Sequence, residues 1–225
     1  DAIVLPFEGG AGSLRVDITF EGPKGRRVLP VLLDTGATFT TLDRKALADL
    51  GVIVPADAPT ARFQTANGEV VNPMVLLPRV WLGDRSVDNV TVAVCEACSQ
   101  EGAWGLLGLN VTGQFQTTVD HELQEIVLTP RNEEANRHLD VTHWLQIEGV
   151  AHRWPTGRVE VDVEATNRSD KAVAASVVEL ECSDRSFAVE IGRVGAHDAR
   201  STHVELPGRA RCDEYRLLLR TARWE

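Results

Sequence analysis

Residues 32–38 read LLDTGAT and place a single carboxylate, that of Asp34, at the end of an apolar run. An apolar strand that ends in an aspartate carries the carboxylate out of the core into a cleft, where it is partly desolvated. Gly36 allows a tight turn that brings backbone N–H groups toward this carboxylate, and the small Ala37 leaves the space beside it open. An ordinary strand-to-turn transition has the same pattern, so the stretch alone leaves both interpretations open.

The segments on either side of this stretch have clear secondary-structure signals. Residues 13–20 alternate polar and apolar side chains, a turn rich in glycine and proline follows, and residues 27–33 are mainly apolar. This pattern predicts a β-hairpin whose second strand ends at the aspartate. After it, we expect one short helix over residues 43–50, with Asp43 as N-cap and Gly51 at its end.

A second hairpin is predicted over residues 62–77. Two alternating segments flank Ala66-Asn67-Gly68, and Asn-Gly between such segments is the strongest short-range hairpin signal. Further strands are expected at residues 79–82, 86–94, 114–120 and 125–129.

The chain is predicted to contain two domains of the all-β class. Residues 130–137 are polar and charged without apolar periodicity, so we place the first domain at residues 1–132, a linker at 133–142 and a second domain at 143–225. The second domain repeats strand and turn at roughly ten-residue spacing. Six or seven short strands in about 80 residues are typical of a small immunoglobulin-like β-sandwich.

Composition excludes several classes of protein. The 225 residues are 43% hydrophobic and 25% charged, with a formal net charge of -10, and contain no basic run. We therefore expect no nucleic-acid partner, because phosphate binding needs clustered Lys and Arg. No apolar stretch approaches the roughly 20 residues of a membrane helix. The chain begins Asp1-Ala2-Ile3, which we interpret as a trimmed segment whose leader or membrane anchor would lie outside the sequence.

The four cysteines form a close pair, Cys95-x-x-Cys98, and a distant pair, Cys182 and Cys212. An even count suits an oxidising compartment, with one local and one long-range disulfide. A zinc site would require all four sulfurs to converge from two regions, and a redox-active Cys-x-x-Cys usually opens a helix in a βαβ unit. We favour the two disulfides and expect a periplasmic or extracellular protein without metal or cofactor.

Several motifs together resemble the aspartic peptidases of the retroviral, or retropepsin-like, type, including its bacterial single-domain members. Residues 32–38 resemble their active-site signature, and residues 104–110, which read WGLLGLN, resemble their later apolar-apolar-Gly element. The hairpin at Asn67-Gly68 lies where the family has its flap, a lid over bound peptide. Residues 114–130 resemble the closing hairpin, so the resemblance covers about residues 13–130; the second domain resembles no peptidase.

The resemblance implies a retropepsin-like closed β-fold, half of a two-lobed acid protease, and a set of site residues. In the family, the hydroxyl of Thr35 locks the loop against its twofold mate, the two hydrophobes run through that loop, and the following glycine opens a short helix. The implied residues are the catalytic Asp34; the loop residues Thr35, Gly36 and Ala37; the flap residues Thr65, Ala66, Asn67 and Gly68; and the floor residues Leu106, Leu107 and Gly108.

This chemistry needs two carboxyl groups, an ionised one that takes a proton from water and a protonated one that hydrogen-bonds to the carbonyl of the peptide bond. The two share one proton, because like charges about 3 Å apart cannot both ionise. Asp34 is the only aspartate in the chain followed by Thr-Gly or Ser-Gly. A twofold homodimer would supply the second carboxylate without any new sequence. We therefore expect the working enzyme to be a homodimer.

The expected substrate is an extended protein or peptide segment that adds a strand between flap and floor. Subsites lined by Leu32, Val70, Leu106 and Leu107 would favour apolar or aromatic residues at the cut. Two alternatives stay open: a catalytically silent peptide- or protein-binding module of the same fold, and a protein whose working part is the C-terminal sandwich as an interaction domain.

Overall fold

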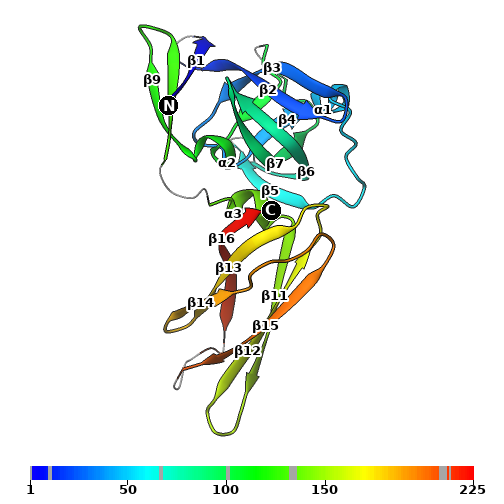
Figure 1. Ribbon diagram of the computed structural model, residues 1–225, viewed down its shortest axis with the longest axis vertical. Coiled ribbons are helices and arrows are strands. Elements are labelled where there is room, and N and C mark those ends of the chain that lie inside the picture. Colours follow the sequence, from blue (N-terminus) through cyan, green and yellow to red (C-terminus); the bar gives the residue numbers. More distant parts are fainter. Residues whose placement is uncertain are drawn as a thin grey trace. The chain divides into compact units, whose positions relative to one another are not determined.

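A computed structural model shows two compact units, residues 1–135 and residues 136–225. Each is described here by itself, and Figure 1 shows the elements of both. The structure describes residues 2–9, 12–65, 68–99, 102–131, 136–207, 212 and 214–225.

Unit 1 is built almost entirely of strands, with two short helices among its described residues. Its elements are β1 (Ile3–Glu8), β2 (Arg15–Gly22), β3 (Gly25–Leu33), β4 (Thr40–Asp43), α1 (Arg44–Asp49), β5 (Thr60–Thr65), β6 (Gly68–Leu82), β7 (Arg85–Cys95), β8 (Gly105–Leu107), α2 (Leu109–Thr112), β9 (Phe115–Asp120) and β10 (Glu125–Pro130).

The strands of unit 1 form a closed sheet. They are ordered β5-β6-β7-β4-β8-β3-β2-β1-β10-β9, and an additional pairing of β6 with β2 closes the six strands from β6 to β2 into a ring. Thr19 pairs with Trp81 at this closure. Closure removes exposed strand edges and encloses one apolar core, to which alternate residues of most strands contribute, including Ile18, Leu77 and Leu107.

Unit 2 consists of one short helix and two three-stranded antiparallel sheets in its described part. Its elements are α3 (His138–Thr142), β11 (Leu145–Arg153), β12 (Val159–Asn167), β13 (Val173–Cys182), β14 (Ser186–Glu190), β15 (Ala199–Leu206) and β16 (Tyr215–Trp224). The sheets are ordered β11-β12-β15 and β14-β13-β16, and buried residues of both belong to one core, as in a β-sandwich. The predicted all-β class is confirmed.

The structure differs from the predicted elements in five places, one of which is β8, a three-residue strand that was not predicted. β1 was not predicted, because Pro6 interrupts a short segment, and β4 was not predicted, because it is stabilised by pairing with β7 and β8 and not by a local pattern. β6 is one strand where two were expected. The predicted linker contains α3, whose Val141 is fully buried in the core of unit 2.

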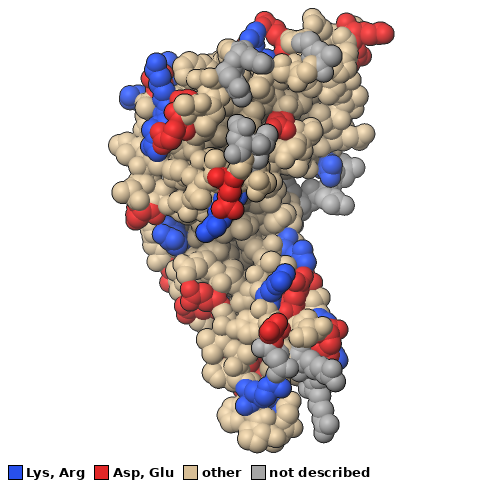
Figure 2. Space-filling model, turned by 180° about the vertical axis from the view of Figure 1, so that it is seen from behind, with Lys and Arg blue, Asp and Glu red and all other residues tan. Residues whose placement is uncertain are grey.

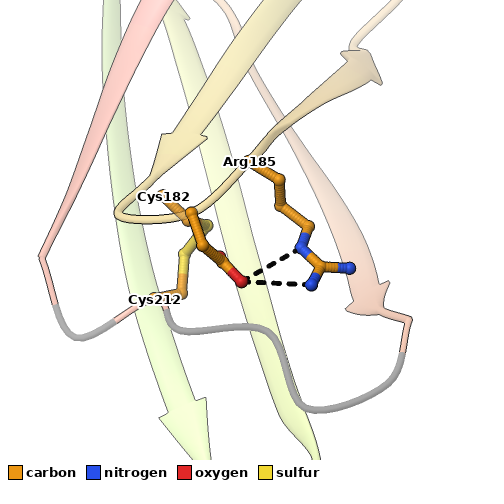
Figure 3. Close-up of a disulfide and its surroundings, with 4 residues drawn as sticks. Cys182, Arg185 and Cys212 are labelled. Atoms are coloured by element: carbon orange, nitrogen blue, oxygen red, sulfur yellow. Dashed lines mark hydrogen bonds and ion pairs between the residues drawn. A yellow bond between two sulfur atoms is a disulfide. The ribbon is translucent and has the colours of Figure 1, made fainter.

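One of the two expected disulfides is present. Cys182 and Cys212 are joined (Figure 3). The amide of Cys182 donates a hydrogen bond to the carbonyl of Arg185 at 2.9 Å, where the chain turns back after β13. The disulfide contradicts the four-sulfur zinc alternative. It also indicates an oxidising compartment.

The predicted Cys95–Cys98 disulfide is not formed, and both residues are free thiols. Their loop is held by Asp43 instead, whose Oδ2 accepts hydrogen bonds from the amides of Cys98 and Ser99 at 3.2 and 3.3 Å. Burial, followed by a hydrogen bond with Cys95, raises the pKa of the Cys98 thiol. Cys98 therefore stays protonated at neutral pH, which makes it a poor nucleophile and disfavours the redox-active alternative.

Charged side chains of both signs are interspersed on the surface shown in Figure 2. None of the helices in the described ranges is long and apolar enough to cross a membrane.

We expect unreduced, denatured protein to contain two reactive thiols, those of Cys95 and Cys98, in a colorimetric thiol titration. Replacing Cys182 and Cys212 by alanine should lower the free energy of unfolding by about 3–4 kcal/mol, because a cross-link over a separation of 30 residues restricts the unfolded chain. The double alanine variant of Cys95 and Cys98 is the control, and its free energy of unfolding should fall by less. Four titratable thiols in the native sequence would contradict the assignment.

Candidate active site

Asp34 follows the last residue of β3 and is fixed by backbone hydrogen bonds on both sides of that strand. The amide of Leu33 donates a hydrogen bond to the carbonyl of Leu14 at 2.8 Å, and the amide of Asp34 donates one to the carbonyl of Leu107 at 3.1 Å. The Asp34 residue is half-buried. The sheet therefore sets the place at which this carboxylate leaves the core.

The loop after β3 folds back on the carboxylate. The amide of Gly36 donates to Asp34 Oδ1 at 2.8 Å, and the amide of Ala37 donates to the Asp34 carbonyl at 3.3 Å. A Cβ on Gly36 would lie 3.2 Å from the same Oδ1, so a larger residue would press on the carboxylate. Thr35 and Gly36 are exposed, whereas Ala37 is half-buried.

Strand alternation decides which floor residues face the side of Asp34. Leu32 pairs with Leu106, and Leu33 pairs with Leu107, in the parallel β3–β8 ladder. Because successive side chains point to opposite faces, Leu32, Asp34 and Leu106 share one face, where both leucines are half-buried. Leu107 faces the other way and is 1% exposed in the core.

The prediction that Leu107 lines a subsite is therefore corrected: its side chain belongs to the core, and its backbone carbonyl accepts the hydrogen bond from Asp34. The expected short helix after Gly108 is present as α2, with Gly108 as its N-cap.

Gly108 lies where two backbone segments come unusually close. A Cβ at this position would be 2.4 Å from the Phe39 carbonyl carbon and 2.7 Å from the Thr40 amide nitrogen. Only a residue without a side chain fits against a backbone at that distance. This contact allows the start of α2 to approach the segment that follows the Asp34 loop.

The flap hairpin is formed by β5 and β6. Ala66 and Asn67, at its predicted turn, lie outside the described residues, as does the side chain of Thr65; Gly68 begins β6 with a φ of 115°.

The inner face of this hairpin can be assigned from its register. Val70 pairs with Phe63, and directly paired residues project to the same side of a sheet. The ring of Phe63 lies edge-on to that of Phe39, with centroids 6.1 Å apart. Val70, which is 40% exposed, therefore projects to the same side as Phe63, the side of the segment that follows the Asp34 loop.

Three polar residues lie behind the loop: Thr40, Thr91 and Asn110. Of these, only Asn110 belonged to a motif in the sequence analysis, at the end of residues 104–110. All three are buried, and the Asn110 side chain bonds to Thr40 and to the Thr91 carbonyl. A threonine or asparagine inside an apolar, strand-like context is the signal that could have identified them, since buried polar groups need partners.

Comparison with known proteins supports the assignment of unit 1. Residues 16–111 match the family model described as aspartyl protease. Over these residues the chain is similar in sequence to the aspartyl protease family, which confirms the resemblance predicted from the motifs.

Two solved structures are similar to the chain. A retropepsin-like aspartic protease from Rickettsia conorii has 20% identity and a TM-score of 0.44, covering 57% of this chain and 92% of that chain. Basic 7S globulin from soybean has 12% identity and a TM-score of 0.39, covering 77% of this chain and 60% of that chain. No curated protein sequence matches.

We expect Gly108→Ala to lower the free energy of unfolding by at least about 2 kcal/mol, because the added methyl group overlaps backbone atoms that cannot move without displacing the loop. Urea unfolding followed by tryptophan fluorescence measures this loss. Gly12→Ala is the control, since its Cβ would meet nothing within 4 Å, and it should change stability by less than about 0.5 kcal/mol. Equal stability of the two variants would show that the close approach is absent.

Proposed function

We propose that unit 1 is an aspartic endopeptidase in which Asp34 acts together with Asp34 of a second copy of the chain. The proposal is carried by the half-buried carboxylate at the end of β3, hydrogen-bonded by the Gly36 amide, within a region of aspartyl protease sequence. A homodimer supplies the second carboxylate, because Asp34 is the only aspartate followed by Thr-Gly or Ser-Gly.

The two carboxylates would hold one proton between them over a wide pH range, since their titration belongs to the pair. The ionised carboxylate takes a proton from a water molecule, whose oxygen attacks the carbonyl carbon of the peptide bond. The protonated carboxyl gives its proton to the carbonyl oxygen. The tetrahedral gem-diol then collapses: the carboxyl that took the proton from water transfers it to the amide nitrogen, the other carboxylate takes a proton from a hydroxyl of the gem-diol, and the C–N bond breaks.

The substrate would be a peptide segment in extended conformation, added as a strand between the β5–β6 hairpin and the floor. Leu32, Leu106 and Val70 offer apolar surface on the two sides of that space. We therefore propose apolar or aromatic residues at the cut. A peptide-library profile that favours charged residues there would contradict this preference.

The Cys182–Cys212 disulfide supports a periplasmic or extracellular location. We propose that unit 2 is an interaction domain that places the peptidase near its substrate or the cell envelope. A chain without unit 2 that cleaves an unfolded model protein as fast as the full chain, yet fails to cleave its natural substrate, would support this role. Equal cleavage of the natural substrate would contradict it.

Asp34→Asn should abolish cleavage of casein between pH 4 and 7, with a loss of at least about a thousandfold in rate, because the amide can neither accept nor share the proton. Asp49→Asn, an equal change at an exposed aspartate at the end of α1, should leave the rate unchanged. Mass spectrometry of the casein fragments measures the cleavage rates of both variants.

Two results would contradict the proposal in different ways. Equal cleavage by wild type and Asp34→Asn would mean another mechanism or a contaminant. If a broad peptide library shows binding to both proteins and cleavage by neither, unit 1 is a peptide-binding module of the same fold.

A further inference from the structure

Thr40 and Asn110 form a buried polar pair beside the Asp34 loop. Their exposed fractions are 0% and 4%. Asn110 Oδ1 accepts two hydrogen bonds from Thr40, one from its amide at 2.7 Å and one from its hydroxyl at 3.0 Å. A single amide oxygen therefore holds both the backbone and the side chain at the start of β4.

The pair links three elements of unit 1. Thr40 Oγ1 also accepts a hydrogen bond from the Gly108 amide at 3.2 Å, and Asn110 Nδ2 donates to the carbonyl of Thr91 in β7 at 2.8 Å. Gly108 precedes α2, Thr40 begins β4 and Thr91 belongs to β7. The hydrogen bonds thus form a continuous chain from one backbone amide to one backbone carbonyl through two side chains.

The backbone at the start of α2, at Leu109 and Asn110, also holds the Asp34 loop. The amide of Leu109 donates to the carbonyl of Ala37 at 2.8 Å, and the amide of Asn110 donates to the carbonyl of Thr38 at 3.0 Å. α2 has only four residues, too few to be stable on its own. Its position, and with it the position of residues 37 and 38, depends on the contacts that Thr40 and Asn110 make.

Burying an amide and a hydroxyl costs free energy unless each group finds hydrogen-bond partners. Apolar side chains could fill the same space without needing such partners. What the polar pair adds is direction, since each hydrogen bond fixes a distance and an angle. Catalytic groups are sensitive to such placement, and a displacement of about 1 Å can lower a rate by about a hundredfold.

We propose that Thr40 and Asn110 are positioning residues that set where Asp34 stands relative to the carboxylate of the second copy. They do not touch substrate. The proposal rests on the proposed peptidase function, and it assigns to this buried pair the alignment of the carboxylate dyad.

The test is Thr40→Val, which keeps the shape of the side chain and removes the hydroxyl that accepts from Gly108 and donates to Asn110. We expect kcat on a peptide substrate to fall about ten- to a hundredfold, with KM within about twofold of wild type. The pH profile of kcat/KM should also move, because the pKa values of a coupled pair depend on its separation.

Two variants control for a loss of stability alone. Thr40→Ser keeps the hydroxyl and should recover the rate to within about threefold of wild type. Ile18→Val shortens a fully buried side chain in β2, distant in sequence from the loop, and should lower the thermal midpoint while kcat and the pH profile stay as in wild type.

Amide hydrogen exchange, read by NMR, gives a second measure that needs no activity. The Leu109 and Asn110 amides should exchange at least about tenfold faster in Thr40→Val than in Ile18→Val. Unchanged exchange overturns the proposal, whether or not the wild type cleaves peptides. If the wild type cleaves and Thr40→Val has the kcat and pH profile of Ile18→Val, the positioning role is wrong and the peptidase function stands.

Discussion

The carbonyl oxygens of Ala37 and Thr38 accept hydrogen bonds from the amides of Leu109 and Asn110, so two segments about 70 residues apart in sequence meet beside Asp34. Gly108 makes this approach sterically feasible, and its missing side chain leaves the two backbones in contact. The floor of the site, the first turn of α2 and the start of β4 all depend on this contact. It converts the end of one strand into a loop of defined shape.

In the β3–β8 ladder, the leucines around the loop face two different sides of the sheet. Leu33 and Leu107 face the core and contribute to its apolar stability, whereas Leu32 and Leu106 share the face of Asp34. A shift of one residue in this register would place the carboxylate in the core. The closed sheet resists such a shift, because β3 is paired on both sides, with β2 and with β8.

Elements that depend on neighbouring residues were predicted from the sequence. Elements that depend on contacts between distant segments were not. The helix after Asp43 was predicted correctly because its cap is local: Asp43 Oδ1 accepts from the Lys45 amide at 2.9 Å. β4 and the Thr40–Asn110 pair were missed because their partners lie far along the chain, and Leu107 was assigned to the cleft because its alternation was not applied to β8. The free Cys95 and Cys98 show that spacing alone does not establish a disulfide, since Asp43 already holds that loop.

A mixing experiment tests most directly whether two copies of Asp34 form one site. Wild type and Asp34→Asn would be unfolded and refolded together at a constant total concentration, and peptide cleavage measured against the wild-type fraction. If each active site needs one Asp34 from each chain, activity follows the square of that fraction, with about a quarter remaining at equal amounts. Activity proportional to the wild-type fraction would show that a single chain is sufficient and would contradict the account.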